Sequence, residues 1–177
     1  MADILTRFYT PGTPLYDTLV LHSEAVARKA LHCLEARRIH ADADFIYEAA
    51  MLHDIGIIHT HAPSIHCTGP LPYICHGIEG RKMLDDLALH RHALVCERHT
   101  GAGLTVDDII AQNFPLPRRD MTPRTVEERL VCYADKFFSK SGNLTAEKPL
   151  DRVIASMEAH GPDTLARFLA LHEEFAP

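Results

Sequence analysis

Apolar residues recur at helical spacing along most of this chain, while alternating β-branched runs are few. In the first such stripe the inward positions are Leu15, Leu19, His22, Val26, Ala30 and Cys33. Intervals of three, four and seven residues place side chains on one face of an α-helix. Thr13-Pro14 supplies an N-cap followed by proline at the first helical position, so the pattern predicts a helix from there to about Arg37.

Similar stripes, each with start and stop signals, predict further helices. Their approximate bounds are residues 44–55, 73–89, 92–99, 105–113, a long helix opened by Thr122-Pro123, 149–159 and 163–175. Residues 57–72 contain three prolines, one glycine and three histidines, which favours a surface loop. The chain is therefore predicted to be all-α.

The chain has 177 residues, 46% of them apolar. This length fits one compact domain, and no repeat, low-complexity tract or Ser/Gly linker divides it. No apolar run approaches the ~18 residues that a membrane span requires, and the start lacks a signal-peptide pattern. Five cysteines without a CxxC pair fit a reducing compartment. We therefore expect a single-domain cytoplasmic protein without a membrane partner.

The net charge of −6 at pH 7 argues against a nucleic-acid scaffold. The basic doublets Arg37-Arg38 and Arg118-Arg119 are isolated, and no longer run exists to follow a phosphate backbone. A local site can nevertheless be positive on an acidic protein, so small anionic ligands remain open as partners. The sequence leaves the oligomeric state undetermined.

Thirteen histidines are an unusual number for this length. Six polar residues from five predicted helices fall on or beside inward faces: His22, His53, Asp54, His76, His99 and Asp135. An aspartate facing a core is costly unless it is paired or coordinated, so a cation is the economical partner. Nitrogen and oxygen donors without a thiolate favour Fe or Mn, with Zn, Ni, Co or Mg as alternatives.

Four imidazoles and two carboxylates exceed what one catalytic ion needs, and they are sufficient for two. Adjacent His53 and Asp54 project about 100° apart and can converge on one or two ions. We expect Asp54 to bridge two divalent ions. A solvent ligand held between them would be deprotonated near neutral pH and placed to attack phosphorus.

The segment Met51-Leu-His-Asp-Ile-Gly56 resembles the HDIG signature of the HD-domain superfamily, and the positions of His22, His53-Asp54 and Asp135 match its sequential pattern. Three more segments resemble the six-ligand branch, which includes small stand-alone HDIG proteins and the symmetrical diadenosine tetraphosphate hydrolases. These segments are His76-Gly-Ile-Glu-Gly80, Arg98-His-Thr-Gly101 and Tyr133-Ala-Asp135. The resemblance covers about residues 21–140. It implies one HD-type helical bundle over residues 1–177 around a central metal site, with C-terminal packing helices at about 149–175.

The resemblance also implies a metal-dependent phosphohydrolase acting on a phosphomonoester or phosphoanhydride of a nucleotide or small phosphometabolite. Ile57-Ile58-His59 lacks the Glu-Asp pair of alarmone hydrolases, and Thr100-Gly-Ala-Gly103 differs from the GYP-type element of cyclic di-GMP phosphodiesterases. Neither of those two activities is therefore favoured. Some similar proteins use an iron pair to activate dioxygen on a polyol or phosphonate, which is one alternative. A non-catalytic ligand-binding HD domain is another.

Phosphate ligands need positive groups beside the metals. Lys136, Arg98 and Arg81 flank the expected ligands in sequence, and Lys140 is a further candidate. Asp54, Lys136 and Arg98 are accordingly the expected catalytic residues, with Lys136, Arg98 and Arg81 on the substrate phosphate. A solvated helix face is the structural alternative for each cation.

Three further histidines, His59, His61 and His66, lie close to the metal motif in sequence, together with Cys67 and Cys75. They permit an accessory zinc site or a mobile lid, in which His59 or His61 would donate a proton to the leaving oxygen. A solvated loop is the simpler alternative.

Overall fold

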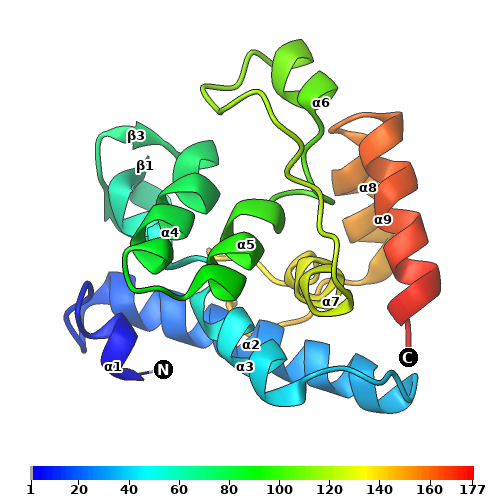
Figure 1. Ribbon diagram of the computed structural model, residues 1–177, viewed down its shortest axis with the longest axis horizontal. Coiled ribbons are helices and arrows are strands. Elements are labelled where there is room, and N and C mark those ends of the chain that lie inside the picture. The colour runs from blue at the N-terminus through cyan, green and yellow to red at the C-terminus, as the bar shows by residue number, and fades with distance from the viewer. Residues whose placement is uncertain (1) are drawn as a thin grey trace.

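The computed structural model describes residues 2–177, and within them helices dominate (Figure 1). The nine α-helices of this range are α1 (Ala2–Leu5), α2 (Pro14–Ala36), α3 (Ala43–Leu52), α4 (His76–Asp85), α5 (His90–Arg98), α6 (Val106–Ala111), α7 (Val126–Asp135), α8 (Leu150–Glu158) and α9 (Pro162–Phe175). The all-α prediction is confirmed. No helix among the described residues is both long enough and apolar enough to cross a bilayer.

The caps define where several helices begin. The Thr13 side chain accepts from the amide of Tyr16 at the start of α2, as the sequence predicts. Thr105 and Asp108 form the expected capping box of α6. The start predicted at Thr122 is wrong, because Thr125 is the N-cap of α7 and an isolated bridge between Leu104 and Met121 keeps the preceding chain extended.

Two other predicted helices are shorter than expected. The second ends at Leu52 rather than near residue 55, because a 3₁₀ turn, η1 (Ile55–His59), follows His53 and Asp54. The helix predicted over residues 73–89 begins with the 3₁₀ turn η3 (Tyr73–Cys75) and stops at Asp85 as α4. Both shifts place a predicted metal ligand at a helix terminus.

Residues 57–72 carry structure that the loop prediction missed. They contain part of η1, the 3₁₀ turn η2 (Pro63–Ile65) and three short strands: β1 (Thr60–Ala62), β2 (Cys67–Thr68) and β3 (Leu71–Pro72). The strand order is β2-β1-β3, with β1 antiparallel to β2 and parallel to β3. Thr60 pairs with Leu71, and His61 lies opposite Thr68.

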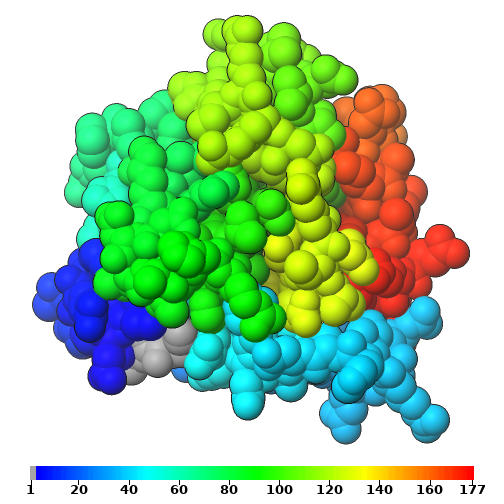
Figure 2. Space-filling model, in the orientation of Figure 1, coloured from blue at the N-terminus to red at the C-terminus, as the bar shows by residue number. Residues whose placement is uncertain are grey.

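The helices are arranged around a centre formed by the middle of α2 and the ends of α3, α4, α5 and α7 (Figure 1). Helices α2 and α3 lie side by side, α7 packs on both, α9 packs on α7, and α8 packs on α9. In the space-filling view, the green α5 segment meets the yellow α7 segment on one face (Figure 2). Buried apolar residues of these helices form the main core, including Ile46, Leu130, Tyr133 and Phe168.

Two glycines allow α4 to approach η1 closely. A Cβ at Gly56 would overlap the carbonyl oxygen of His76 and the backbone of Gly80. A Cβ at Gly80 would lie 3.2 Å from the amide nitrogen of Gly56 in η1, and equally close to the Cys96 side chain of α5. This close backbone packing brings the start of α4 beside the turn that carries Asp54.

Candidate metal centre

All six histidines and aspartates predicted to face inward lie together in the protein interior. Their exposed fractions run from 0% to 7%: His22 0%, His53 0%, Asp54 0%, His76 3%, His99 1% and Asp135 7%. They are contributed by the middle of α2 and by the termini of α3, α4, α5 and α7. Segments far apart in the sequence thus converge on one buried polar cluster.

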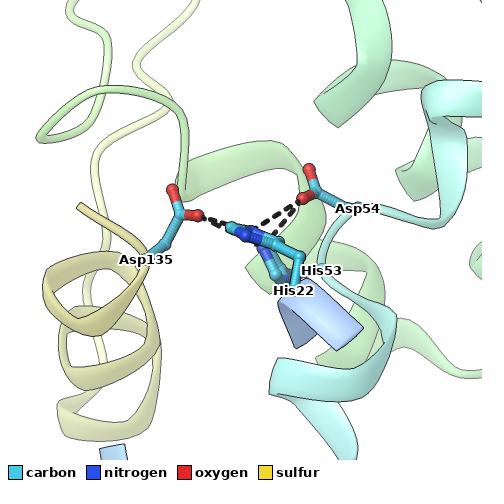
Figure 3. A group of neighbouring side chains, drawn as sticks. All are labelled: His22, His53, Asp54 and Asp135. Atoms are coloured by element: carbon cyan, nitrogen blue, oxygen red, sulfur yellow. Dashed lines mark hydrogen bonds and ion pairs between the residues drawn. The ribbon is translucent and has the colours of Figure 1, made fainter. Parts of the chain in front are cut away.

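Four of these side chains form a first donor group (Figure 3). The imidazoles of His22 and His53 lie between the carboxylates of Asp54 and Asp135. Nε2 of His22 is 3.0 Å from Oδ1 of Asp135 and 3.4 Å from Oδ2 of Asp54. Nε2 of His53 is 3.0 Å from the same Asp54 oxygen and 3.5 Å from Oδ1 of Asp135.

The second donor group uses the other oxygen of Asp54. Its Oδ1 lies 3.5 Å from Nε2 of His76 and 3.4 Å from Nε2 of His99. The two imidazole nitrogens are themselves 3.0 Å apart. Donor atoms at bond lengths of about 2.0–2.2 Å from one ion are separated by about 3.0–3.5 Å, so both groups have the spacing of a ligand set. Asp54 belongs to both and is placed to bridge two ions.

Backbone carbonyls orient three of the imidazoles. Nδ1 of His53 is 2.6 Å from the carbonyl oxygen of Ala50, and Nδ1 of His76 is 2.7 Å from that of Tyr73. Nδ1 of His99 is 2.8 Å from the carbonyl oxygen of Cys96. Because a carbonyl only accepts, each Nδ1 carries the proton and each ring directs its Nε2 into the cluster. This is how metal-binding histidines are usually held.

The cluster also contains polar atoms without hydrogen-bond partners. They include Nε2 of His53 and Oδ1 of Asp54, both fully buried. Unpaired buried polar atoms are costly, and the facing lone pairs of His76 and His99 repel each other unless a cation lies between them. The donor set, its spacing and its unpaired atoms therefore fit bound divalent ions.

Charge coupling in the cluster keeps both carboxylates ionised. Burial opposes ionisation of Asp54, but His53 and Lys140 hold the pKa of its carboxyl well below the ordinary value. Burial likewise opposes ionisation of Asp135, whose pKa is held well below the ordinary value by Lys136 and Lys140. Burial lowers the pKa of His76 to about 3, so that imidazole is a neutral donor.

Two lysines reach the aspartates. Nζ of Lys136 lies 2.7 Å from Oδ2 of Asp135 and donates to the carbonyl oxygen of His99 at 3.0 Å. Nζ of Lys140 lies 2.7 Å from Oδ2 of Asp54 and 3.8 Å from Oδ1 of Asp135. Lys140 lies five residues beyond the end of α7, so helical periodicity gives it no face, and only its closeness to Lys136 in sequence pointed to it.

The two predicted arginines pair with carboxylates outside the cluster. NH1 of Arg98 lies 3.0 and 2.9 Å from the two carboxylate oxygens of the buried Glu128. Arg81 pairs with Glu97 and with Asp85. Neither guanidinium is brought to Asp54 or Asp135 in the way the lysines are.

The histidines of residues 57–72 lie outside the centre. His59, His61 and His66 are exposed, whereas Cys67 and Cys75 are buried. Across residues 2–177, the two donor groups that share Asp54 are the ones in which three or more metal-binding side chains converge. The accessory zinc site that these histidines and cysteines would form is thus not assembled in the structure.

A helical bundle enclosing a buried histidine–aspartate cluster defines a helical domain with a candidate metal site. The family model of the HD domain matches residues 19–139. The chain therefore belongs to the HD-domain family, as its motifs predict. No solved structure matches the chain.

The curated proteins that are similar to the chain include the following three. A tRNA (cytidine(56)-2′-O)-methyltransferase of Picrophilus torridus is 31% identical over 90% of this chain and 42% of its own length. One with the same name from Thermoplasma volcanium is 28% identical over 76% of this chain and 36% of its own length. An uncharacterized protein of Methanocaldococcus jannaschii is 26% identical over 89% of this chain and 88% of its own length. The chain thus spans less than half of the two named methyltransferases.

Proposed function

We propose that this chain is a metal-dependent phosphohydrolase that cleaves a phosphomonoester or phosphoanhydride of a nucleotide or small phosphometabolite. The observation that carries the proposal is the buried pair of donor groups joined by Asp54, with the ammonium of Lys140 at 2.7 Å from its carboxylate. Hydrolysis of a phosphate ester or anhydride needs positive charge close to the phosphoryl oxygens, and bound metal ions together with a lysine ammonium would supply it.

Each side chain has a role in this proposal. His22, His53 and Asp135 would hold one divalent ion, His76 and His99 a second, and Asp54 both. Fe or Mn fits the nitrogen and oxygen donors. When bound, such ions supply Lewis acidity toward a phosphoryl oxygen.

Three cationic side chains, Lys140, Lys136 and Arg98, have different roles in this proposal. Lys140 binds an oxygen of the substrate phosphate, since its ammonium already lies among the carboxylates. Lys136 holds Asp135 ionised and in place through its 2.7 Å ion pair. Arg98 contributes through its buried pair with Glu128, which fixes the end of α5 next to His99.

The relatives favour a nucleotide among phosphorylated metabolites. The two methyltransferases are named for a reaction on tRNA, and a region similar to this chain makes up 42% and 36% of them. The transferase activity in their names belongs to much longer proteins, and most of their length lies outside the region similar to this chain. The net charge of −6 disfavours a long nucleic acid as the substrate here and leaves a mononucleotide or short phosphoanhydride.

The test is metal analysis of protein purified without added metal, followed by a screen of nucleotides and phosphoesters with the metal found. We expect bound Fe or Mn, and hydrolysis that also proceeds without oxygen. The Asp54→Ala variant should lose metal and activity together. Bound metal without turnover on the whole panel, or an Asp54→Ala protein with full metal content and full hydrolysis, would refute the proposal.

A further inference from the structure

A cavity of about 310 Å³ opens next to the metal centre. One wall comes from β1, η2 and η3, the segment predicted to be a plain loop, and contributes Ser64, Ile65 and Tyr73. The opposite wall comes from the chain just beyond α7 and contributes Phe138, Lys140 and Ser141. The cavity therefore lies between two segments that also bound the cluster.

Two lining residues connect the cavity to the metal centre directly. Lys140 lines the cavity and places its Nζ 2.7 Å from Oδ2 of Asp54. Tyr73 lines it too, and its ring stacks on the imidazole of His76 with centroids 4.7 Å apart. A molecule whose phosphate reaches the cluster would consequently extend its remaining part into this cavity.

The lining suits the organic part of a phosphorylated molecule. Two aromatic side chains, Tyr73 and Phe138, give the lining an apolar part, and the hydroxyls of Ser64 and Ser141 offer hydrogen bonds. Lys140 is the one charged residue lining the cavity, and no carboxylate lines it. By contrast, the larger cavity beside α5 is lined by three carboxylates together with Arg91, and no residue of the metal centre lines it.

We infer that this cavity is the subsite for the nucleoside part of a nucleoside monophosphate, and that Lys140 binds the phosphate where the cavity meets the metal centre. Its volume lies at the small end of the roughly 300–1,000 Å³ found for small-molecule pockets, which fits one nucleoside rather than two. The inference rests on the proposed function, because it assigns a substrate class to that same site.

Binding measurements on the metal-loaded protein test this without turnover. The probes are inorganic phosphate and the four ribonucleoside 5′-monophosphates in which a methylene group replaces the ester oxygen, so that hydrolysis is blocked. We expect at least one analogue to bind about tenfold or more tightly than phosphate, because the cavity contacts add to the phosphate contacts. Equal affinity of phosphate and all four analogues would overturn the subsite.

Two variants distinguish the contribution of the cavity to binding from that of Lys140. Ser64→Trp fills the cavity at an exposed position and should weaken analogue binding about tenfold or more while phosphate binding stays within about twofold. Lys140→Met should weaken both about tenfold or more, because both share the phosphate. Unchanged analogue binding in Ser64→Trp, or unchanged phosphate binding in Lys140→Met, would overturn the assignment.

Controls keep these outcomes distinct. Lys82→Met removes an exposed lysine that pairs with Glu79 and should leave binding unaltered. Each variant must contain as much metal as the parent protein. If Ser64→Trp does not fold, Ser141→Trp on the other wall of the cavity takes its place. Tight analogue binding by a protein that hydrolyses no member of the nucleotide and phosphoester panel would refute the proposed function and retain the subsite. If the parent protein hydrolyses its substrate but Ser64→Trp leaves analogue binding unchanged, the proposed function stands and the subsite is refuted.

Discussion

The phenol hydroxyl of Tyr9 donates to the carbonyl oxygen of Ile55 at 2.6 Å and accepts from the amide of Ile58 at 3.2 Å. Tyr9 is 3% exposed and precedes the segment matched by the HD-domain family. It therefore ties the N-terminal segment to the 3₁₀ turn that follows Asp54. We regard Tyr9 as a positioning residue for this turn.

Tyr9→Phe removes both hydrogen bonds and leaves two backbone groups without their partner. We expect the free energy of unfolding to fall by about 2 kcal/mol, because buried polar groups lose their pairing. Urea denaturation of the metal-free protein measures this free energy of unfolding. Tyr47→Phe is the matched control, since Tyr47 is 44% exposed. Equal stability of the two variants would contradict a positioning role for Tyr9.

Removing single ligands should separate the two donor groups. His99→Ala affects the group of Asp54, His76 and His99, and should reduce bound metal from about two ions to about one per chain. Asp54→Ala affects both groups and should leave less than one ion, because Asp54 is shared. Metal analysis after gel filtration gives the number of metal ions bound per chain. Identical metal content in the two variants would show that Asp54 does not join two sites.

The packing of α4 against η1 depends on Gly56. In Gly56→Ala the added methyl overlaps backbone atoms of His76 and Gly80, which cannot move as a flexible side chain would. We expect a loss of about 3 kcal/mol in unfolding free energy together with weaker metal binding, since His76 is displaced. Gly142→Ala is the comparison: its methyl meets nothing within 4 Å, and its φ of +73° should cost only about 1 kcal/mol.

The buried pair of Arg98 and Glu128 gives a test of what Arg98 does. Arg98→Met leaves the Glu128 carboxylate, 4% exposed, with the Arg124 amide as its remaining hydrogen-bond partner. We expect unfolding free energy to fall by about 3 kcal/mol with unchanged metal content. The double variant Arg98→Met, Glu128→Leu should regain part of that loss. A raised KM with undiminished stability would instead favour the phosphate-binding role predicted from sequence.

Local patterns determined most helices and all six members of the cluster. Thr13 and Thr105 cap helices through bonds to residues three positions away, so their sequence neighbours suffice to identify the starts. His22 and Asp135 were recognisable because a polar side chain on an apolar stripe needs a buried partner. The HD motif around Asp54 added the family. These signals are all contained in short stretches of the chain.

Tertiary structure alone decided which cation reaches the metal centre and where a substrate would lie. Lys140 follows a helix terminus, so its position depends on how the chain turns after Asp135. Arg98 meets a carboxylate thirty residues away, and Tyr9 meets a turn forty-six residues away. Tyr73 and Phe138 come from opposite walls of one cavity. Helical periodicity specifies a face within one element, but contacts between distant segments exist only once the elements have packed together.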